Sequence, residues 1–208
     1  MTSRCALALL FSCSCAYGVA PGEKASADAG AVDDLTIMQL RNPSNPAHPA
    51  LGSNVVVRDA VVTDVKTTGN SHGFFAQDPV ATSWAGVYVF VGPEVPPVER
   101  GDVVRVRGVY STYVGLEEID ARDGSIEKTG SREIPDNVIV SLNEIEPNGF
   151  RPLELQSMLV RVQNVFATTD TAGREFTIGD LHSGAAITVT SYMANDTGPS
   201  PLPAYQGE

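Results

Sequence analysis

The sequence predicts an all-β chain, in which a small five-stranded barrel or sandwich is followed by part of a second, similar unit. Three observations support this prediction. Apolar and polar residues alternate in short runs from residue 53 onward, which is typical of half-buried strands. Glycine and proline are frequent, at 19 and 14 of 208 residues, as in proteins with many tight turns. The order of these runs then recurs toward the C-terminal end.

The expected strands of the first unit are short and are separated by turn residues. The first strand places Val55, Val57 and Val61 on one face, and Asp59 interrupts that apolar face, which predicts a β-bulge. Turn-forming and Pro-rich segments then separate the later strands. These later strands are expected at residues 74–77, 86–91, 102–110 and 116–119.

The second unit repeats the first three strands. The matching segments are residues 158–165 with 55–62, 175–180 with 74–78, and 186–189 with 86–89. Gly207-Glu208 then falls where Gly101-Asp102 opens the fourth strand of the first unit. We therefore expect the second unit to stop after three strands. Either the reading frame is truncated, or another molecule completes an edge that proteins avoid exposing.

The first 15 residues predict an export signal. A positive charge at Arg4 precedes a short apolar stretch, which is the order found in secretory signals. Residues 10–13, Leu-Phe-Ser-Cys, resemble the lipobox of bacterial lipoproteins, in which Cys13 becomes the lipidated first residue. The alternatives are signal cleavage near Ala16 and a wrongly chosen start codon. We expect an outer or cell-surface membrane lipoprotein, or a secreted protein.

Composition divides the rest of the chain. Residues 16–50 are expected to be a disordered tether and a Pro-rich lead-in, with a first ordered segment at residues 35–40. The barrel, the connection and the partial second unit then follow at residues 51–130, 131–152 and 153–208.

The charge balance bears on the class of ligand. Acidic residues outnumber basic residues 25 to 14, which gives a formal net charge of −11. Nucleic-acid binders draw much of their affinity from neutralising phosphates, so they usually carry a basic surface. Binding of a polyanion would therefore need a local basic patch on this chain.

Several segments together resemble one known family: residues 61–65, 73–79, 85–90, 101–109 and 113–119. Gly-Phe-Phe-Ala-Gln-Asp-Pro at residues 73–79 is one example. They are similar to the OB-fold modules that precede the catalytic domain of large secreted bacterial nucleases and related exported proteins. The resemblance covers residues 52–122, and residues 153–208 less completely. It implies a Greek-key OB-like barrel followed by a partial second one, without the separate domain that performs the nuclease chemistry.

OB barrels that bind nucleic acid use the face of the second and third strands with the flanking loops. Aromatic side chains there stack on bases and basic side chains contact phosphates. The alternative is that Phe75 and one aromatic of the third strand are core residues, and that the arginines are solvated and offset by Glu117 and Glu118. The candidates for this face are Lys66, His72, Phe75, Tyr88, Phe90, Arg105, Arg107, Tyr110 and Tyr113.

The sequence offers little for catalysis. All three cysteines lie within the first 15 residues, which excludes disulfides, thiolate metal sites and cysteine nucleophiles from the folded part. His48, His72 and His182 lack metal-ligand spacing, and residues 120–125 lack the alternating acids of a calcium loop and are expected to form a turn. We expect no cofactor, no metal and no enzymatic activity.

Two functions remain open. One is a non-catalytic binding or accessory module of the cell envelope that acts in protein or polymer interaction, with an envelope or extracellular protein as its partner. The other is a nucleic-acid-binding OB module derived from or associated with an extracellular nuclease, which would bind single-stranded nucleic acid. In both cases only a lipid anchor would hold the protein to a membrane.

Overall fold

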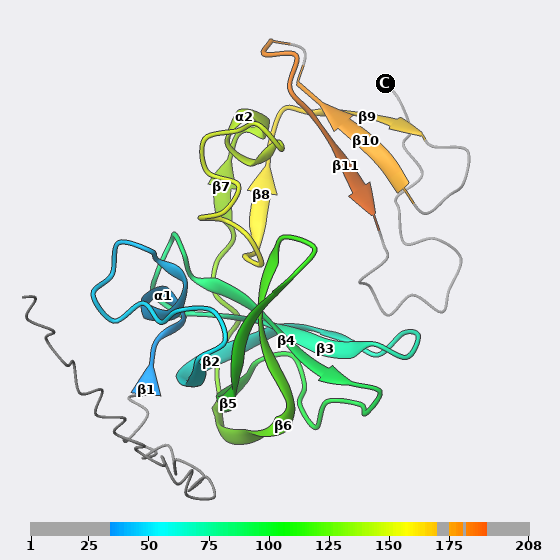
Figure 1. Cartoon of the computed structure of the whole chain (residues 1–208). Helices are drawn as coiled ribbons and strands as arrows, with labels where there is room; N and C mark the ends of the chain where they lie inside the picture. Colours follow the sequence, from blue (N-terminus) through cyan, green and yellow to red (C-terminus); the bar gives the residue numbers. More distant parts are fainter. Residues whose placement is uncertain (1–33, 170–174, 181, 191–208) are drawn as a thin grey trace, which may run out of the picture. The chain divides into compact units, whose positions relative to one another are not determined.

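The computed structural model describes residues 34–169, 175–180 and 182–190 (Figure 1). The expected signal segment, Cys13 and the tether up to residue 33 lie outside the described residues, as does the segment 191–208. Within the described residues, no helix combines the length and the apolar character needed to cross a membrane.

The first six strands form one sheet in the order β1-β2-β3-β4-β6-β5, and β5 also pairs with β2. Strands β2 to β6 therefore close into a ring of hydrogen-bonded strands, in which only the β4–β6 pair is parallel. The prediction of an all-β fold is confirmed. The bounds are β1 (Asp34–Leu35), β2 (Asn54–Lys66), β3 (His72–Gln77), β4 (Gly86–Gly92), β5 (Asp102–Tyr113) and β6 (Leu116–Ser131).

Strand β2 bends so that its two halves serve different neighbours. Its first half pairs with β5 and its second half with β3, and Val61 pairs with both. The register shifts between Val57 and Ala60, where Asp59 has a φ of 56°. Aspartate tolerates this left-handed conformation better than most side chains do. The bulge expected at Asp59 is therefore present, and it helps to turn the sheet into a ring.

One expected turn is instead part of a strand. Residues 120–125 lie within β6, which continues to Ser131. Opposite them, the pairing jumps from Arg107–Ser125 to Val109–Asp120, so the residues between Asp120 and Ser125 bulge out of the ladder. The glycine and small polar residues that predicted a turn accommodate a wide bulge, after which the long β5–β6 hairpin resumes.

Valine is the most frequent residue in the core of the ring, and core residues alternate with outward-facing residues along the strands. A short helix, α1 (Ile37–Arg41), adds Ile37 and Leu40 to this core. Its first turn is closed by a capping box between Thr36 and Gln39. The ordered segment expected at residues 35–40 thus contains the end of β1 and most of α1.

The following part of the chain contains smaller sheets. Strand β7 (Val138–Val140) pairs in parallel with β8 (Val160–Val162), and α2 (Leu142–Ile145) lies between them in the chain. A three-stranded antiparallel sheet then follows, hereafter the meander, in the order β11-β10-β9. Its strands are β9 (Phe166–Thr169), β10 (Glu175–Gly179) and β11 (Ala186–Thr190).

The region after residue 138 repeats the beginning of the ring at an interval of 105 residues. Leu35 pairs with Val57 as Val140 pairs with Val162, so β7 corresponds to β1. Thr36 and Ser141 each begin a short helix with a capping box. We call residues 34–131 the first copy and residues 138–190 the second copy.

Unusual backbone angles recur at the same interval. Asp59 and Asn164 both have a φ of 56°, while Gly52 and Ser157 have φ values of 87° and 63°. Left-handed non-glycine residues are uncommon, so their recurrence is specific. The interval differs from that of the expected alignment, which placed residue 158 rather than 160 opposite Val55. A two-residue slip keeps every strand residue on its own face, so alternation alone cannot detect it.

The turn that follows β3 in the first copy has the same hydrogen bonds as the turn that follows β10 in the second copy. The amide of Asp78 donates to the Ala85 carbonyl at 2.8 Å, and the amide of Asp180 donates to the Ala185 carbonyl at 3.0 Å. Each aspartate carboxylate also accepts a hydrogen bond from the amide two residues later. The meander therefore corresponds to the second half of β2, to β3 and to β4, whereas β8 corresponds to the first half of β2.

Candidate ligand-binding face

The outer surface of the ring carries a row of side chains across four strands. Asp64 on β2 is opposite Phe75 on β3, Phe75 is opposite Tyr88 on β4, and Tyr88 is opposite Glu118 on β6. Directly opposed residues place their side chains on the same face of a sheet. The intervening residues, such as Phe74, belong to the core, so this row faces outward. Two aromatic rings are thus flanked by a carboxylate on each side.

The two rings are in contact. Their centroids are 5.0 Å apart and their planes are tilted by 52°, within the range of favourable aromatic pairs. Tyr88 also lies over Gly73, where a Cβ atom would overlap the tyrosine hydroxyl. Glycine at position 73 therefore leaves room for Tyr88 to lie flat along the strand, where it is buried while Phe75 stays partly exposed.

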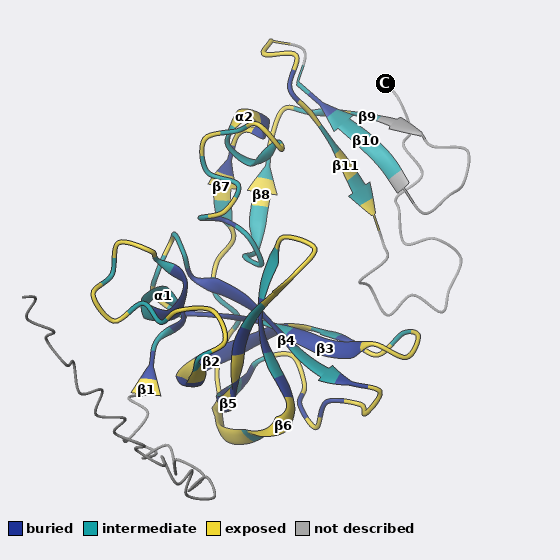
Figure 2. Cartoon of the chain, viewed as in Figure 1, coloured by how far each residue is buried: buried dark blue, intermediate teal, exposed yellow. Residues whose placement is uncertain are grey.

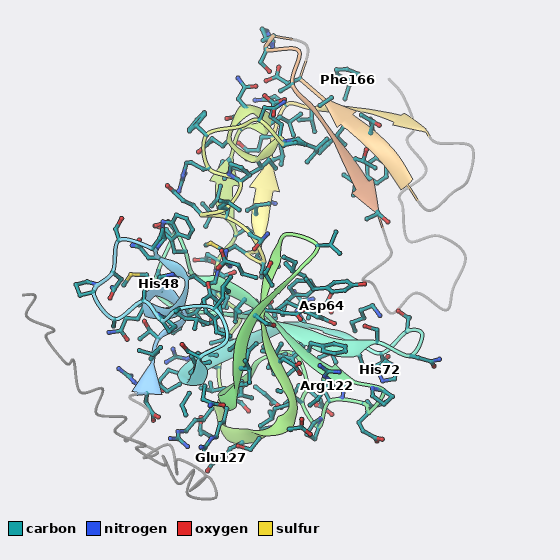
Figure 3. The ribbon with its side chains drawn as sticks, viewed as in Figure 1. His48, Asp64, His72, Arg122, Glu127 and Phe166 are labelled. Carbon is teal, nitrogen blue, oxygen red and sulfur yellow. The ribbon has the colours of Figure 1, made fainter. Side chains whose placement is uncertain are left out.

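A second row lies beside the first and contains the third aromatic residue. Phe90 is opposite Asp120, and the guanidinium of Arg122 lies 5.3 Å from the centroid of the Phe90 ring. Arg122 also bonds Asp120, with Nη2 and Oδ2 2.6 Å apart. Figure 3 labels Asp64 and Arg122 in this region, near β3 and β4. A cation already stacks on this face, which demonstrates its geometry for cation–π contact.

The charges of the two rows are mainly negative. Burial raises the pKa of Glu118, and the nearby Asp120 raises it further, against a hydrogen bond from Ser111 and the charge of Arg122. The pKa of Asp120 is lowered, chiefly by its hydrogen bonds from Arg122. Three carboxylates, those of Asp64, Glu118 and Asp120, thus surround the aromatic rings. We call the surface formed by Asp64, Phe75, Tyr88, Phe90, Glu118, Asp120 and Arg122 the aromatic–acidic face.

Lys66 and His72, two predicted site residues, instead shape the β2–β3 turn. The Lys66 ammonium donates to the carbonyl oxygens of Thr68 at 2.8 Å and Ser71 at 2.5 Å. The Nε2 atom of His72 is 2.8 Å from the Gly69 carbonyl oxygen. Both side chains are buried. Their polar groups hold the turn beside the aromatic–acidic face.

Arg105 and Arg107 share the outer face of β5, as predicted, but they do not join the aromatic rows. In the ring, β6 separates β5 from β4. Arg105 is opposite Glu127 and makes a two-pronged ion pair with Asp34, at 2.7 and 3.0 Å. Because strand order places these arginines on another side of the ring, the expectation that they lie near Tyr88 is not met.

The last two predicted residues, Tyr110 and Tyr113, are separated from each other. Tyr110 is buried, and its hydroxyl donates to the Glu117 carboxylate. Burial, followed by this carboxylate, raises the pKa of Tyr110. Tyr113 is 69% exposed at the end of β5, next to the exposed Val114. Phe75, Tyr88 and Phe90 are therefore the predicted residues that the structure brings together.

A buried polar cluster surrounds Arg41 beside Gly86, the first residue of β4. Arg41 is fully buried, its Nε atom is 2.7 Å from Glu117 Oε2, and its Nη1 atom donates to the Gly86 carbonyl at 2.5 Å. Its Nη2 atom donates to the Leu153 carbonyl at 3.0 Å. Glu117 thus binds Arg41 and Tyr110 rather than offsetting Arg105 and Arg107. Sequence reasoning missed this arginine because it lies in the Pro-rich lead-in.

The same cluster connects the two copies. Gln156, in the segment leading to β8, accepts from Arg41 and from the Glu117 amide and donates to the Gly115 carbonyl at 2.9 Å. Beside it, a Cβ atom on Gly86 would overlap the carbonyl group of Ser157. In the second copy the equivalent residue is Ala186, which does carry a Cβ atom. These groups hold chain segments together and satisfy one another, so we assign this cluster to structure.

Metal binding is not indicated by the described part of the chain, where no three His, Cys, Asp or Glu side chains gather as metal ligands would. No protein-family model, curated protein or solved structure matches the chain. Its function is therefore inferred from the ring and from the aromatic–acidic face.

Proposed function

We propose that this protein is an exported, non-catalytic OB-fold binding module of the cell envelope that acts by binding a protein partner. The fold assignment is supported by the ring of strands. When β2 to β6 are counted in chain order, the first strand pairs with the second and fourth, and the third pairs in parallel with the fifth. The same order of pairing is typical of the Greek-key arrangement of OB barrels, which supports the proposal. The resemblance of residues 52–122 to OB modules of secreted nucleases agrees with it.

The observation that carries the proposal is the composition of the aromatic–acidic face. In an OB barrel this face, built on the second and third strands, is the usual binding surface. Here it presents aromatic rings between carboxylates. Carboxylates attract Lys and Arg side chains, and aromatic rings accept them by cation–π contact, as Phe90 accepts Arg122. The ligand that fits is an extended, positively charged polypeptide segment.

Nucleic acid fits this face less well. Its bases could stack on Phe75 and Phe90, but its phosphates would meet Asp64, Glu118 and Asp120. Arg122, the described cation of this face, is bound to Asp120, and Lys66, in the turn beside the face, is bound to turn carbonyls. Binding of single-stranded nucleic acid therefore remains the second candidate, supported by the family resemblance.

The location of the protein is proposed from the first 15 residues. The order of a positive charge, a short apolar stretch and Cys13 supports export with a lipid anchor, or secretion after cleavage near Ala16. Either fate would place the binding module outside the cytoplasm.

The test is a titration of the full chain with a fluorescent oligolysine peptide and, separately, with single-stranded DNA and RNA, at low and high salt. We expect the peptide to bind, with an affinity that falls as salt rises. Phe90→Ala and the double change Asp64→Asn with Asp120→Asn should each weaken peptide binding about tenfold, or about 1.4 kcal/mol.

The matched control is Glu127→Gln, which removes an exposed carboxylate of β6 that lies away from the face (Figure 3). If Glu127→Gln weakens binding as much as the changes in the face do, the peptide senses only the overall acidity of the chain and the proposal fails. Salt-sensitive binding of DNA or RNA without peptide binding would establish the nucleic-acid alternative.

A further inference from the structure

An arginine of the chain itself occupies part of the aromatic–acidic face. The Arg122 guanidinium carbon lies 5.3 Å from the centroid of the Phe90 ring. Its Nε and Nη2 atoms donate to the two oxygens of the Asp120 carboxylate, at 3.0 and 2.6 Å. Ring stacking and a two-pronged bond to a carboxylate are the contacts that suit a planar guanidinium best. Phe90 and Asp120 therefore form a guanidinium site, hereafter the guanidinium subsite.

Three carboxylates act on this one guanidinium. The hydrogen bonds to Asp120 and the charge of that carboxylate raise the pKa of Arg122 most. The charges of Asp123 and Glu118 raise this pKa further. A cation that took the place of Arg122 would be attracted by the same three carboxylates. The subsite therefore favours a guanidinium whether the group belongs to this chain or to a ligand.

Arg122 reaches the subsite from a bulge of β6. The register of β6 with β4 ends at Asp120, and its register with β5 passes from Asp120 to Ser125. Arg122 lies between these two positions, and its side chain is 58% exposed. Figure 2 shows most of β6 beyond Asp120 in yellow, as exposed. The Arg122 side chain can therefore turn away from Phe90 without breaking the pairing of either neighbouring strand.

The contacts that hold Arg122 are individually weak. An exposed ion pair gains little in water, because solvation and side-chain entropy oppose it. Cation–π contacts at exposed sites are similarly modest. The stem of Arg122 packs over Gly92, where a Cβ atom would lie 3.2 Å from the arginine Cγ. A ligand that supplies its own guanidinium, and that also contacts Phe75 and Asp64, can therefore replace Arg122.

We propose that Arg122 is an internal substitute for the ligand, and that an arginine side chain of the partner polypeptide displaces it from the guanidinium subsite. This inference rests on the proposed binding of a positively charged segment, and it names the residue type that the face selects. Lysine fits the subsite less well, because its ammonium is a compact charge that cannot form the planar two-pronged bond. A second copy of this chain is a poor source of the arginine, since two chains with a net charge of −11 repel each other.

Internal competition then sets the affinity of the face. When a binding site is free in only a fraction of the molecules, its apparent affinity falls by that fraction. Arg122 would lower the affinity in this way, whereas an arginine that contacted the ligand directly would raise it. The two roles therefore predict opposite effects of removing Arg122.

The test compares fluorescent hexa-arginine with fluorescent hexalysine, each titrated against the full chain at one salt concentration. We expect hexa-arginine to bind about fivefold more tightly, and Phe90→Ala to remove this preference. Arg122→Gln should raise the affinity for hexa-arginine about fivefold, because it removes the competing cation. Arg122→Lys keeps the net charge but loses the planar fork, so it should still raise this affinity about twofold.

The matched control is Arg105→Gln. Arg105 also makes a two-pronged ion pair, with Asp34, and its side chain is 42% exposed. It lies on β5, which β6 separates from β4 in the ring. Arg105→Gln therefore removes the same charge at a distance from the subsite, and it should raise the affinity for hexa-arginine by less than about twofold.

Three results with the variants and the complex would overturn the inference. Equal gains in Arg122→Gln and Arg105→Gln would show that the peptide responds only to net charge. A loss of affinity in Arg122→Gln would show that Arg122 itself binds the ligand. An NMR signal of the Arg122 Nε–H group that stays unchanged when hexa-arginine saturates the chain would show that no displacement occurs.

The two peptides separate this inference from the proposed function. Salt-sensitive binding of both peptides with equal affinity would overturn the selection of arginine and leave the proposed function intact. Failure of both peptides to bind at low salt would overturn the proposed function and this inference together.

Discussion

The two copies contain the same series of local structural elements, but their apolar inward residues differ in how far they are buried. Both begin with a short parallel strand and a capped helix, both bend the following strand at a left-handed Asp or Asn, and both turn through the same aspartate motif. Among the described residues, only those of the first copy form a hairpin that buries the inward residues. Local sequence is therefore sufficient to form these shared elements. The buried core of the first copy also needs β5 and β6, which lie farther along the chain.

The strongest test of this difference is to truncate the equivalent core side chain in both copies. Phe74→Ala should lower the free energy of unfolding of the first copy by about 4 kcal/mol, because it leaves a cavity in a closed core. Phe176→Ala should cost about 2 kcal/mol or less, because that ring is already partly exposed. Fluorescence of Trp84, the single tryptophan, reports urea unfolding of the first copy. Amide exchange of β10 reports on the second, and equal losses would mean that both cores are closed.

The next largest effect concerns position 41 and its equivalent, 146. Arg41→Met should destabilise the first copy by about 3 kcal/mol, since Glu117 and the carbonyls of Gly86 and Leu153 lose their donor. Glu146→Met removes a partly exposed side chain and should stay within about 0.5 kcal/mol. Urea unfolding followed by Trp84 fluorescence compares the two. A similar small effect at both positions would show that the Arg41 cluster adds nothing to stability.

The smallest expected effect concerns a feature that the two copies share, the positive φ of Asp59 and Asn164. Asp59→Val and Asn164→Val should each cost about 1–2 kcal/mol, because a β-branched residue is strained at a φ of 56°. Glycine at either position should be tolerated, because it adopts positive φ freely. Thermal unfolding of the four variants measures this. Unequal costs at the two positions would mean that the equivalent bulges are not energetically equivalent.

Alternation and turn residues predicted much of the fold from the sequence. They located the strands of the ring, the bulge at Asp59 and the existence of a repeat. They did not locate the start of the repeat, because β1 and α1 are too short to show a period and lie among prolines. They also did not reveal that β6 continues through residues 120–125, because a wide bulge and a turn use the same residues.

For the candidate face, the sequence identified the aromatic residues and missed their neighbours. Phe75, Tyr88 and Phe90 were recognised by residue type and strand position. Glu118 and Asp120 join them only through the parallel β4–β6 pairing, whose register is not encoded by any short motif. Without this pairing, the sequence could not show that β6 separates Arg105 and Arg107 on β5 from the aromatic residues on β4. Residue type predicted the stacking surface, and non-local pairing decided its charge.

The pairing order of the ring also affects the order in which its contacts form during folding. The contacts that close it join distant parts of the chain, as Val61 joins Val103, whereas the meander joins near neighbours, as Gly179 joins Ala186. Contacts between near neighbours form sooner because less chain entropy is lost in closing the loop. A chain emerging from its N-terminal end must hold β2, β3 and β4 open until β6 has followed. The first copy therefore passes briefly through a form in which β2, β3 and β4 lack the cover that β5 and β6 later supply.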